Sequence, residues 1–302
     1  MAVGLFAVLF CFVAAAISAT HETSACSRRD SVAAARFAVH VINAQRLHGF
    51  KFKLVELVSS KYQKDLWGVC YIALKVKLLQ TKCHFTNPKS HERCDLFRPD
   101  ERGAAATCDV KLYVMGRVGT VTRYNCVTKP EPSNKVLAQI CPGCPTLSPL
   151  DDPTALKAAR EATLRFNRDG KRRNYFALME VAQVLTGYIV HTGTITWLQL
   201  VLVETMCLRE DGLRNRNVNC APRCPDKATY YYCLTDYDEV KEVLGDLDCD
   251  SYSKNPRPTA PDAWEPTCQL FNQSPKASAC KAQLNDPNPD KSVHHICPFP
   301  LK

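Results

Sequence analysis

Residues 34–43, AARFAVHVIN, recur as residues 158–167, AAREATLRFN. Five positions are identical at a common offset of 124 residues: Ala34 with Ala158, Ala35 with Ala159, Arg36 with Arg160, Ala38 with Ala162 and Asn43 with Asn167. Apolar residues in both copies follow the spacing of one helix face. The repeat therefore predicts two domains of the same fold, each opened by one amphipathic helix.

Four cysteines recur in nearly the same register. Offsets of 123 to 126 residues relate Cys83 to Cys207, Cys94 to Cys220, Cys108 to Cys233 and Cys126 to Cys249. We therefore place the first domain at residues 26–128, a linker at 129–145 and the second domain at 146–250. Residues 251–302 contain 9 of the 19 prolines and should form an irregular tail.

Each repeat predicts the same order of elements. Asp30 or Ser31 is the expected N-cap of the first helix. The second helix should begin with Asp152 as N-cap and Pro153, and should end at Gly170. Strand-like alternation follows at residues 52–58, 71–77, 176–182 and 196–202. An α+β fold results, with one helix packed on an antiparallel sheet in each domain.

The composition and the N-terminus indicate a secreted protein rich in disulfides. The 302 residues include 17 Cys, and an apolar content of 46% argues against a disordered chain or a multi-span membrane protein. Residues 1–18 are expected to be a signal peptide, although a membrane anchor is an alternative. Its removal would take Cys11 away and leave 16 cysteines, enough for eight bridges. We expect no later membrane span and, on grounds of compartment, no nucleic-acid partner.

The order of helix, long hairpin, cysteine-closed loop and second hairpin resembles the cystatin fold. Two such units, a C-P-G-C-P motif at residues 141–145, an early Cys26 and a final Cys297 resemble the fetuin family of plasma glycoproteins, and residues 141–167 look more like the fetuin-A branch than fetuin-B. That resemblance implies six disulfides: Cys26–Cys297, Cys83–Cys94, Cys108–Cys126, Cys141–Cys144, Cys207–Cys220 and Cys233–Cys249. Of the remaining cysteines, Cys268 and Cys280 form an acceptable local pair, and joining Cys70 to Cys224 is a guess.

No motif in the sequence favours an enzyme. The C-P-G-C stretch superficially resembles a thioredoxin motif, but it follows a proline-rich linker and not a strand. Zinc binding by Cys141, Cys144, Cys220 and Cys224 is disfavoured because numerous secreted thiols are usually oxidised. We therefore expect no catalytic residue, no cofactor and no metal ion.

The resemblance implies inhibition of an endopeptidase, with the hairpin loops as one candidate surface. Cystatins block papain-type proteases with an apolar wedge that includes the first hairpin loop. The candidate residues at this loop are Gln63, Trp67 and Gly68 in the first domain and His191, Thr192 and Gly193 in the second. Asp65 would place a charge inside the wedge, where desolvation is costly. Ordinary hairpin turns are therefore the favoured interpretation of these loops.

The linker is the second candidate surface. In fetuins that inhibit astacin-type metalloproteases, the two-cysteine linker presents an acidic residue to the catalytic zinc, where a carboxylate can displace the reactive water. Here the linker motif is Cys141, Pro142, Gly143, Cys144 and Pro145, and Gly143 stands at the acidic position. An astacin-type protease is the preferred target and a papain-type protease the second choice. A positive φ at Gly143 would make an acidic substitution costly.

Carriage of calcium phosphate or another anionic ligand is the alternative function. In fetuin-A-like proteins an acidic sheet face of the first domain matches lattice calcium. Residues 27–129 contain 19 Lys and Arg against 8 Asp and Glu, a net charge of +11, whereas residues 150–250 contain 13 against 16, a net of −3. A basic first domain suits a glycosaminoglycan, although a solvated face without a partner is an equal expectation. Asn272 is the one glycosylation sequon, with Pro275 following it unfavourably.

Overall fold

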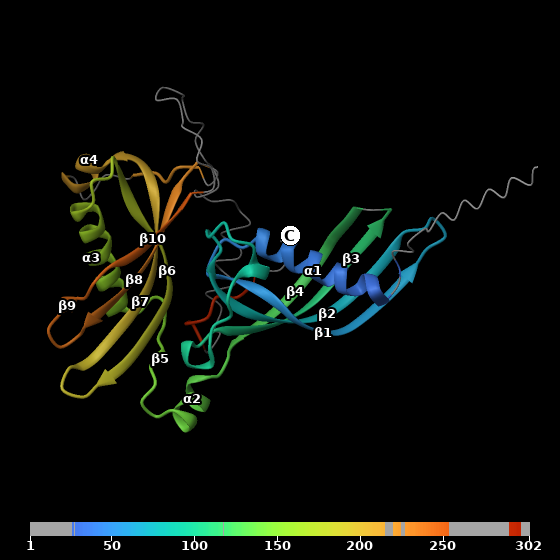
Figure 1. Ribbon diagram of the computed structural model, residues 1–302, viewed down its shortest axis with the longest axis horizontal. Coiled ribbons are helices and arrows are strands. Elements are labelled where there is room, and N and C mark those ends of the chain that lie inside the picture. The colour runs from blue at the N-terminus through green and yellow to red at the C-terminus, as the bar shows by residue number, and fades with distance from the viewer. Residues whose placement is uncertain are drawn as a thin grey trace, which may run out of the picture.

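The computed structural model describes residue 26 and residues 28–116, 118–214, 220–224, 227–253 and 290–296. Two antiparallel sheets lie along these segments, each crossed by one long helix (Figure 1). The expected signal peptide at residues 1–18, the Cys268–Cys280 pair and the sequon at Asn272 lie outside the described residues. No helix in the described part of the chain is long and apolar enough to cross a membrane.

The first sheet has four strands in the order β1-β2-β3-β4. They are β1 Phe50–Lys64, β2 Cys70–His84, β3 Ala104–Met115 and β4 Val118–Pro130. Helix α1, Arg28–Ala44, covers one face, and two short 3-10 turns, η1 His91–Arg93 and η2 Pro99–Glu101, lie between β2 and β3. Ala35, Ala38, Val39 and Ile42 line the buried face of α1 at helical spacing. Alternate residues of β2 complete this core from the sheet side.

The second sheet has the order β10-β8-β7-β6-β5, with β9 paired to β8. Its elements are β6 Asn174–Ile189, β7 Gly193–Leu208, β8 Thr229–Asp238, β9 Val243–Leu244 and β10 Asp248–Ser253, with helix α3 Pro153–Asp169 across it and helix α4 Arg209–Arg214 after β7. The linker contributes helix α2, Asn134–Ile140, and strand β5, Thr146–Leu147. The joining of a linker strand to this sheet was not expected from the sequence.

The repeated asparagines pin each helix to its first strand. Asn43 donates to the carbonyl oxygen of Phe52 at 2.7 Å and accepts from the Phe52 nitrogen at 2.8 Å. Asn167 makes the same two contacts with Phe176, both at 2.8 Å. The two asparagines are 124 residues apart, and so are the two phenylalanines. The same pair of hydrogen bonds between helix and first strand therefore occurs once in each domain.

Helix starts are confirmed in the second domain and shifted in the first. The Asp152 carboxylate accepts a hydrogen bond from the Ala155 nitrogen at 3.0 Å, and Gly170 is the C-cap of α3. Helix α1 begins at Arg28, so the expectation of an N-cap at Asp30 or Ser31 was wrong. Asp30 lies instead in the first turn, where a carboxylate favourably meets the positive end of the helix dipole.

Five of the implied disulfides are confirmed: Cys83–Cys94, Cys108–Cys126, Cys141–Cys144, Cys207–Cys220 and Cys233–Cys249. Two of them staple directly paired strands, since Cys108 faces Cys126 across β3 and β4 and Cys233 faces Cys249 across β8 and β10. Both have a Cα–Cα distance of 4.1 Å. The repeated cysteines thus form, in each sheet, a disulfide between two directly paired strands.

The clasp between Cys26 and Cys297 is wrong, because Cys26 is bonded to Cys70 with a Cα–Cα distance of 5.6 Å. Cys26 precedes α1 and Cys70 begins β2, so the bond ties the start of the helix to the hairpin end of the sheet. Residues 290–296 pack at the other end, where His294 lies beside Gly49. A helix of 17 residues separates the two places by about 25 Å. The same bond rules out Cys70–Cys224, and Cys224 is disulfide-bonded too.

Candidate protease-binding surface

The linker forms a loop that is closed at its base by Asn134. The Asn134 side chain donates to the Leu147 carbonyl oxygen at 3.0 Å and accepts from the Leu147 nitrogen at 3.1 Å. Arg102, itself 1% exposed, donates to the same Asn134 oxygen and, at 2.8 Å, to the carbonyl oxygen of Pro132. The segment between residues 134 and 147 is therefore fixed to the first domain at both of its ends.

The top of this loop is the linker knot, which we define as residues Cys141 to Pro145. Helix α2 leads into it, and the Cys141 nitrogen donates to the Leu137 carbonyl oxygen at 2.7 Å. The Cys144 nitrogen then donates to the Cys141 carbonyl oxygen at 3.1 Å, and the disulfide closes the turn. Pro142 and Gly143 are exposed at its tip.

Gly143 has room for a side chain. A Cβ atom built at this glycine has no neighbour within 4 Å. Its backbone is not among the positive-φ glycines, which are Gly49, Gly68, Gly116 and Gly193. The alternative that Gly143 has a positive φ is therefore ruled out, and an L-residue fits the position without backbone strain.

Strand β5 places the linker knot beside the β6–β7 hairpin. Thr146 and Leu147 pair with Thr186 and Leu185 of β6. Gly187 follows on β6, and a Cβ built there would lie 3.4 Å from the Cα atom of Pro145. The absence of a side chain at Gly187 thus permits the close approach of the knot. Figure 1 shows α2 and the β6–β7 hairpin at the same, lower end of the molecule.

The two hairpins of the second domain, which we call the domain-two hairpins, touch each other. They are the β6–β7 turn at residues 190–192 and the β8–β9 turn at residues 239–242. A Cβ built at Gly193 would lie 2.6 Å from the Cγ2 atom of Val240, so the turns are in contact. Asp238 shapes the second turn by accepting hydrogen bonds from the Val240 and Lys241 nitrogens at 3.0 and 2.9 Å.

Three exposed apolar side chains lie at this end of the second domain. Tyr188 is 71% exposed, Val190 67% and Val240 69%. Sequence reasoning named His191, Thr192 and Gly193 in the first of these turns and missed these three apolar residues. A search for apolar residues inside turns could have found Val190 and Val240. Such exposed side chains on rigid turns are suited to binding a cleft in a partner.

The candidate loop of the first domain lies at the opposite end of its sheet from the linker. Asp65 turns inward there, and its carboxylate accepts hydrogen bonds from the Trp67 and Val69 nitrogens at 2.9 and 2.8 Å. Leu66 and Trp67 are left at the tip, 101% and 89% exposed, between Gln63 and Gly68. The Asp65 charge thus shapes the turn and does not occupy its apolar tip.

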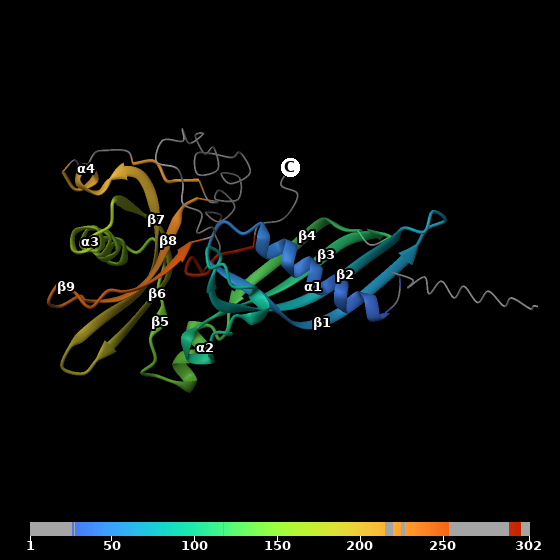
Figure 2. The same cartoon turned by 45° about the horizontal axis from the view of Figure 1, so that its top comes forward.

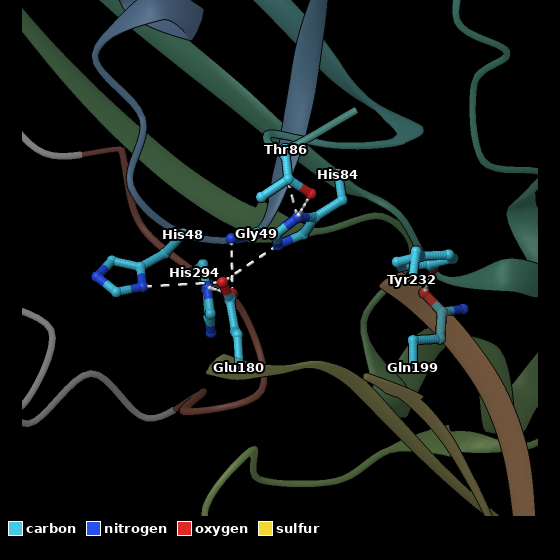
Figure 3. A network of polar contacts seen from close by, with 8 residues as sticks. All are labelled: His48, Gly49, His84, Thr86, Glu180, Gln199, Tyr232 and His294. Carbon is cyan, nitrogen blue, oxygen red and sulfur yellow. Dashed lines mark hydrogen bonds and ion pairs between the residues drawn. The ribbon is translucent and has the colours of Figure 1, made fainter. Parts of the chain in front are cut away.

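The two domains meet around the buried carboxylate of Glu180 on β6, which is 8% exposed (Figure 3). One oxygen accepts from the Gly49 nitrogen at 2.7 Å and lies 3.0 Å from His294 Nδ1. The other lies 3.1 Å from His84 Nε2 and 3.9 Å from His48 Nδ1. We call these five residues the Glu180 cluster. It joins the second domain to the first domain and to residues 290–296.

Burial and hydrogen bonding set the protonation states of the Glu180 cluster. Burial opposes the ionised form of Glu180, but attraction to His84 and hydrogen bonds from His294 and His84 outweigh it and hold the pKa of Glu180 well below its usual range. Burial lowers the pKa of His84, and attraction to Glu180 offsets this only in part. The Thr86 nitrogen donates to His84 Nδ1 at 3.4 Å, which assigns the ring proton to Nε2, facing Glu180.

Arg46 supplies a buried cation beside the cluster. Burial lowers the pKa of Arg46 to about 10, so it stays charged at neutral pH, and attraction to Glu180 acts in the opposite direction. Its guanidinium lies 4.9 Å from the centre of the Phe52 ring. In the described part of the chain, no group of three or more His, Cys, Asp and Glu side chains could hold a metal ion.

Comparison with curated proteins shows relatives of one kind. The chain is similar to antihemorrhagic factor cHLP-B from Gloydius brevicauda, with 26% identity over 69% of this chain and 59% of that protein. Fetuin-B from Mus musculus is 27% identical over 62% of this chain and 47% of its own. Alpha-2-HS-glycoprotein from Ovis aries is 25% identical over 64% of this chain and 52% of its own. The chain is thus similar to proteins of the fetuin family. It spans about half the length of these curated relatives.

Solved fetuin structures share the fold of this chain. The crystal structure of mouse fetuin-B aligns with a TM-score of 0.60 and 20% identity over 80% of this chain and 72% of that one. Mouse fetuin-B in complex with crayfish astacin aligns with a TM-score of 0.58 and 19% identity over 77% of this chain and 73% of that one. The fold class is therefore α+β with two tandem cystatin-like domains. No protein-family model matches the sequence. Relatives from both fetuin branches match at similar identity, and the preference for fetuin-A stays a prediction.

Proposed function

We propose that this chain is a secreted plasma protein that inhibits astacin-type metalloproteases. The inhibitory surface would be the linker knot together with the domain-two hairpins. The observation that supports it is the pairing of β5 with β6, which seats the knot beside Gly187, three residues before Val190, while the β8–β9 turn brings Val240 into contact with Gly193. A solved complex of mouse fetuin-B with crayfish astacin gives the protease class its precedent.

The physical basis is a preformed surface that occupies a cleft. The disulfide, the closure at Asn134 and the β5 pairing hold the knot before binding, so little conformational entropy is lost on association. Each apolar side chain of the hairpins that becomes fully buried would contribute about 1.5–3 kcal/mol. With Gly143 at the tip, the knot can block the cleft but has no carboxylate for the zinc.

The test compares Gly143→Asp with Gly143→Ala against one astacin-type protease. The aspartate adds a carboxylate at an open, unstrained position, so its inhibition constant should fall by about tenfold or more. The alanine adds only a Cβ atom and should leave the constant unchanged. Equal effects of both substitutions would show that zinc ligation plays no part at this position.

The hairpins are tested by Val190→Lys combined with Val240→Lys. A buried unpaired charge is costly, so inhibition should weaken by about tenfold or more. Val58→Lys, at a 48% exposed position of β1, is the matched control and should inhibit like the natural protein. Unfolding temperatures of all variants exclude misfolding. Full inhibition by the double variant would contradict the proposed surface.

A papain-type protease is the second candidate, favoured by the tip of the first domain. Leu66 and Trp67 share this tip with Met115 and Val118 of the β3–β4 hairpin, which are 61% and 66% exposed. Loss of papain inhibition in Trp67→Ser, with astacin inhibition intact, would assign a second surface. Carriage of calcium phosphate stays the alternative function, but the basic charge of the first domain has the wrong sign for lattice calcium.

A further inference from the structure

The face of the first sheet that points away from α1 carries a row of cations. In register across the four strands, Lys61 of β1 faces Ala73 of β2, Ala73 faces Lys111 of β3, and Lys111 faces Arg123 of β4. All four residues are exposed. Because neighbouring strands are about 4.8 Å apart, the Cα atoms of Lys61 and Lys111 are separated by roughly 10 Å.

These three cations have no acidic partner among the residues that the structure describes. None of them takes part in an ion pair among the described residues, in contrast to Lys82, which lies 2.7 Å from Glu101. The acids on this face, Glu56 and Asp109, stand farther along the strands, opposite Lys77 and Lys75. The row at Ala73 is therefore the most positive part of the face.

Lys61, Ala73 and Lys111 line a shallow groove with a volume of about 370 Å³, and Arg123 lies next to it, opposite Lys111. Ala73 leaves space between the Lys61 and Lys111 side chains, and Tyr71 and Tyr113 line the groove one pair farther along the strands. Their ring centres are 6.4 Å apart, and Tyr71 is 51% exposed. The groove thus combines cations with two accessible aromatic faces.

We propose that this groove binds a sulfated glycosaminoglycan chain. Sulfate and carboxylate groups along the polysaccharide would lie against Lys61, Lys111 and Arg123, and the apolar face of a sugar ring would stack on Tyr71 or Tyr113. A groove with charges along its sides fits an extended chain better than a flat bilayer. The exposed apolar tip at Trp67, which a membrane would need, lies beyond the groove at the end of the sheet.

The test uses the full-length secreted protein and a heparin decasaccharide at several salt concentrations. Lys61→Ala, Lys111→Ala and Arg123→Ala combined should weaken binding about tenfold and flatten its salt dependence, because exposed pairs are individually weak but sum along a chain. Lys89→Ala, Arg160→Ala and Lys171→Ala remove the same charge from exposed positions elsewhere and should weaken binding less than twofold.

Two further measurements keep the outcome decisive. Tyr71→Ser should weaken binding severalfold while the salt dependence stays unchanged, and desulfated heparin should bind poorly to every variant. Equal losses in both triple variants would overturn the groove in favour of diffuse charge attraction. Binding to phosphatidylserine vesicles that Trp67→Ser abolishes, without binding to heparin, would overturn it in favour of a lipid surface.

Discussion

Gly49 holds a backbone conformation that its surroundings require. Its φ of +63° is left-handed, and its nitrogen donates to Glu180 at 2.7 Å. A Cβ built there would lie 3.0 Å from Arg46 Nη2 and 3.2 Å from His294 Nδ1. A side chain would therefore meet both strain and crowding.

We predict that Gly49→Ala lowers the free energy of unfolding by about 2 kcal/mol or more. Gly116→Ala is the matched control, because Gly116 has a φ of +60° with no atom within 4 Å of its built Cβ. Gly116→Ala should lower the free energy of unfolding only by the cost of a left-handed backbone, about 1 kcal/mol. Denaturant unfolding of both variants measures the difference. Equal losses would mean that the crowding beside Glu180 has no energetic weight.

At the scale of elements, the paired asparagines carry the junction between helix and first strand. Asn43→Ala leaves the nitrogen and carbonyl oxygen of Phe52 without their buried partner, which should cost about 2–3 kcal/mol. Asn167→Ala should cost the same, since its contacts with Phe176 are equivalent. Asn125→Ala, at an exposed position of β4, should change stability by less than about 0.5 kcal/mol. Calorimetric unfolding of the three variants measures these changes in stability.

Local signals in the sequence predicted these elements well, and distant ones did not. Asp152, Pro153 and Gly170 mark α3 because caps act within one helical turn. The confirmed disulfides join cysteines 3 to 18 residues apart. The wrong assignment paired Cys26 with Cys297 near the chain end, whereas its partner is Cys70, 44 residues away. Strand β5 has two residues, too short for any periodicity. The Glu180 cluster was missed because its members are scattered over residues 48–294.

At the scale of the whole molecule, acid should weaken the contact between the domains. His84 has a lowered pKa when folded, so its contribution to stability is complete above the ordinary value of 6.5 and is lost as the pH falls below it. Glu180 also has a lowered pKa, so its contribution is present above about 4.5 and is lost in stronger acid. His48, His294 and Arg46 face the same carboxylate. Burial also lowers the pKa of His91 and of His295, so protonation below pH 6.5 acts through these two histidines as well as through His84.

We predict that the free energy of unfolding falls between pH 7 and pH 5, with a slope of up to about 1.4 kcal/mol per pH unit for one proton. His84→Gln should reduce this slope, because one of the titrating groups is gone. His191→Gln, which alters an exposed histidine of the β6–β7 turn, should keep the natural slope. Urea unfolding at five pH values provides the measurement. An unchanged slope in His84→Gln would assign the acid sensitivity elsewhere.

The placement of the linker disulfide determines what proteolytic cleavage can achieve. Cys141 and Cys144 bracket the exposed Pro142–Gly143 peptide bond, α2 holds the chain before it, and β5 holds the chain after it. An enzyme that hydrolysed this bond would open a small ring without releasing a fragment. The new amino and carboxyl ends would stay tethered at high effective concentration, where resynthesis competes with dissociation. Such a molecule would migrate as two pieces only after reduction, and while its disulfides last it would continue to occupy the enzyme that cut it.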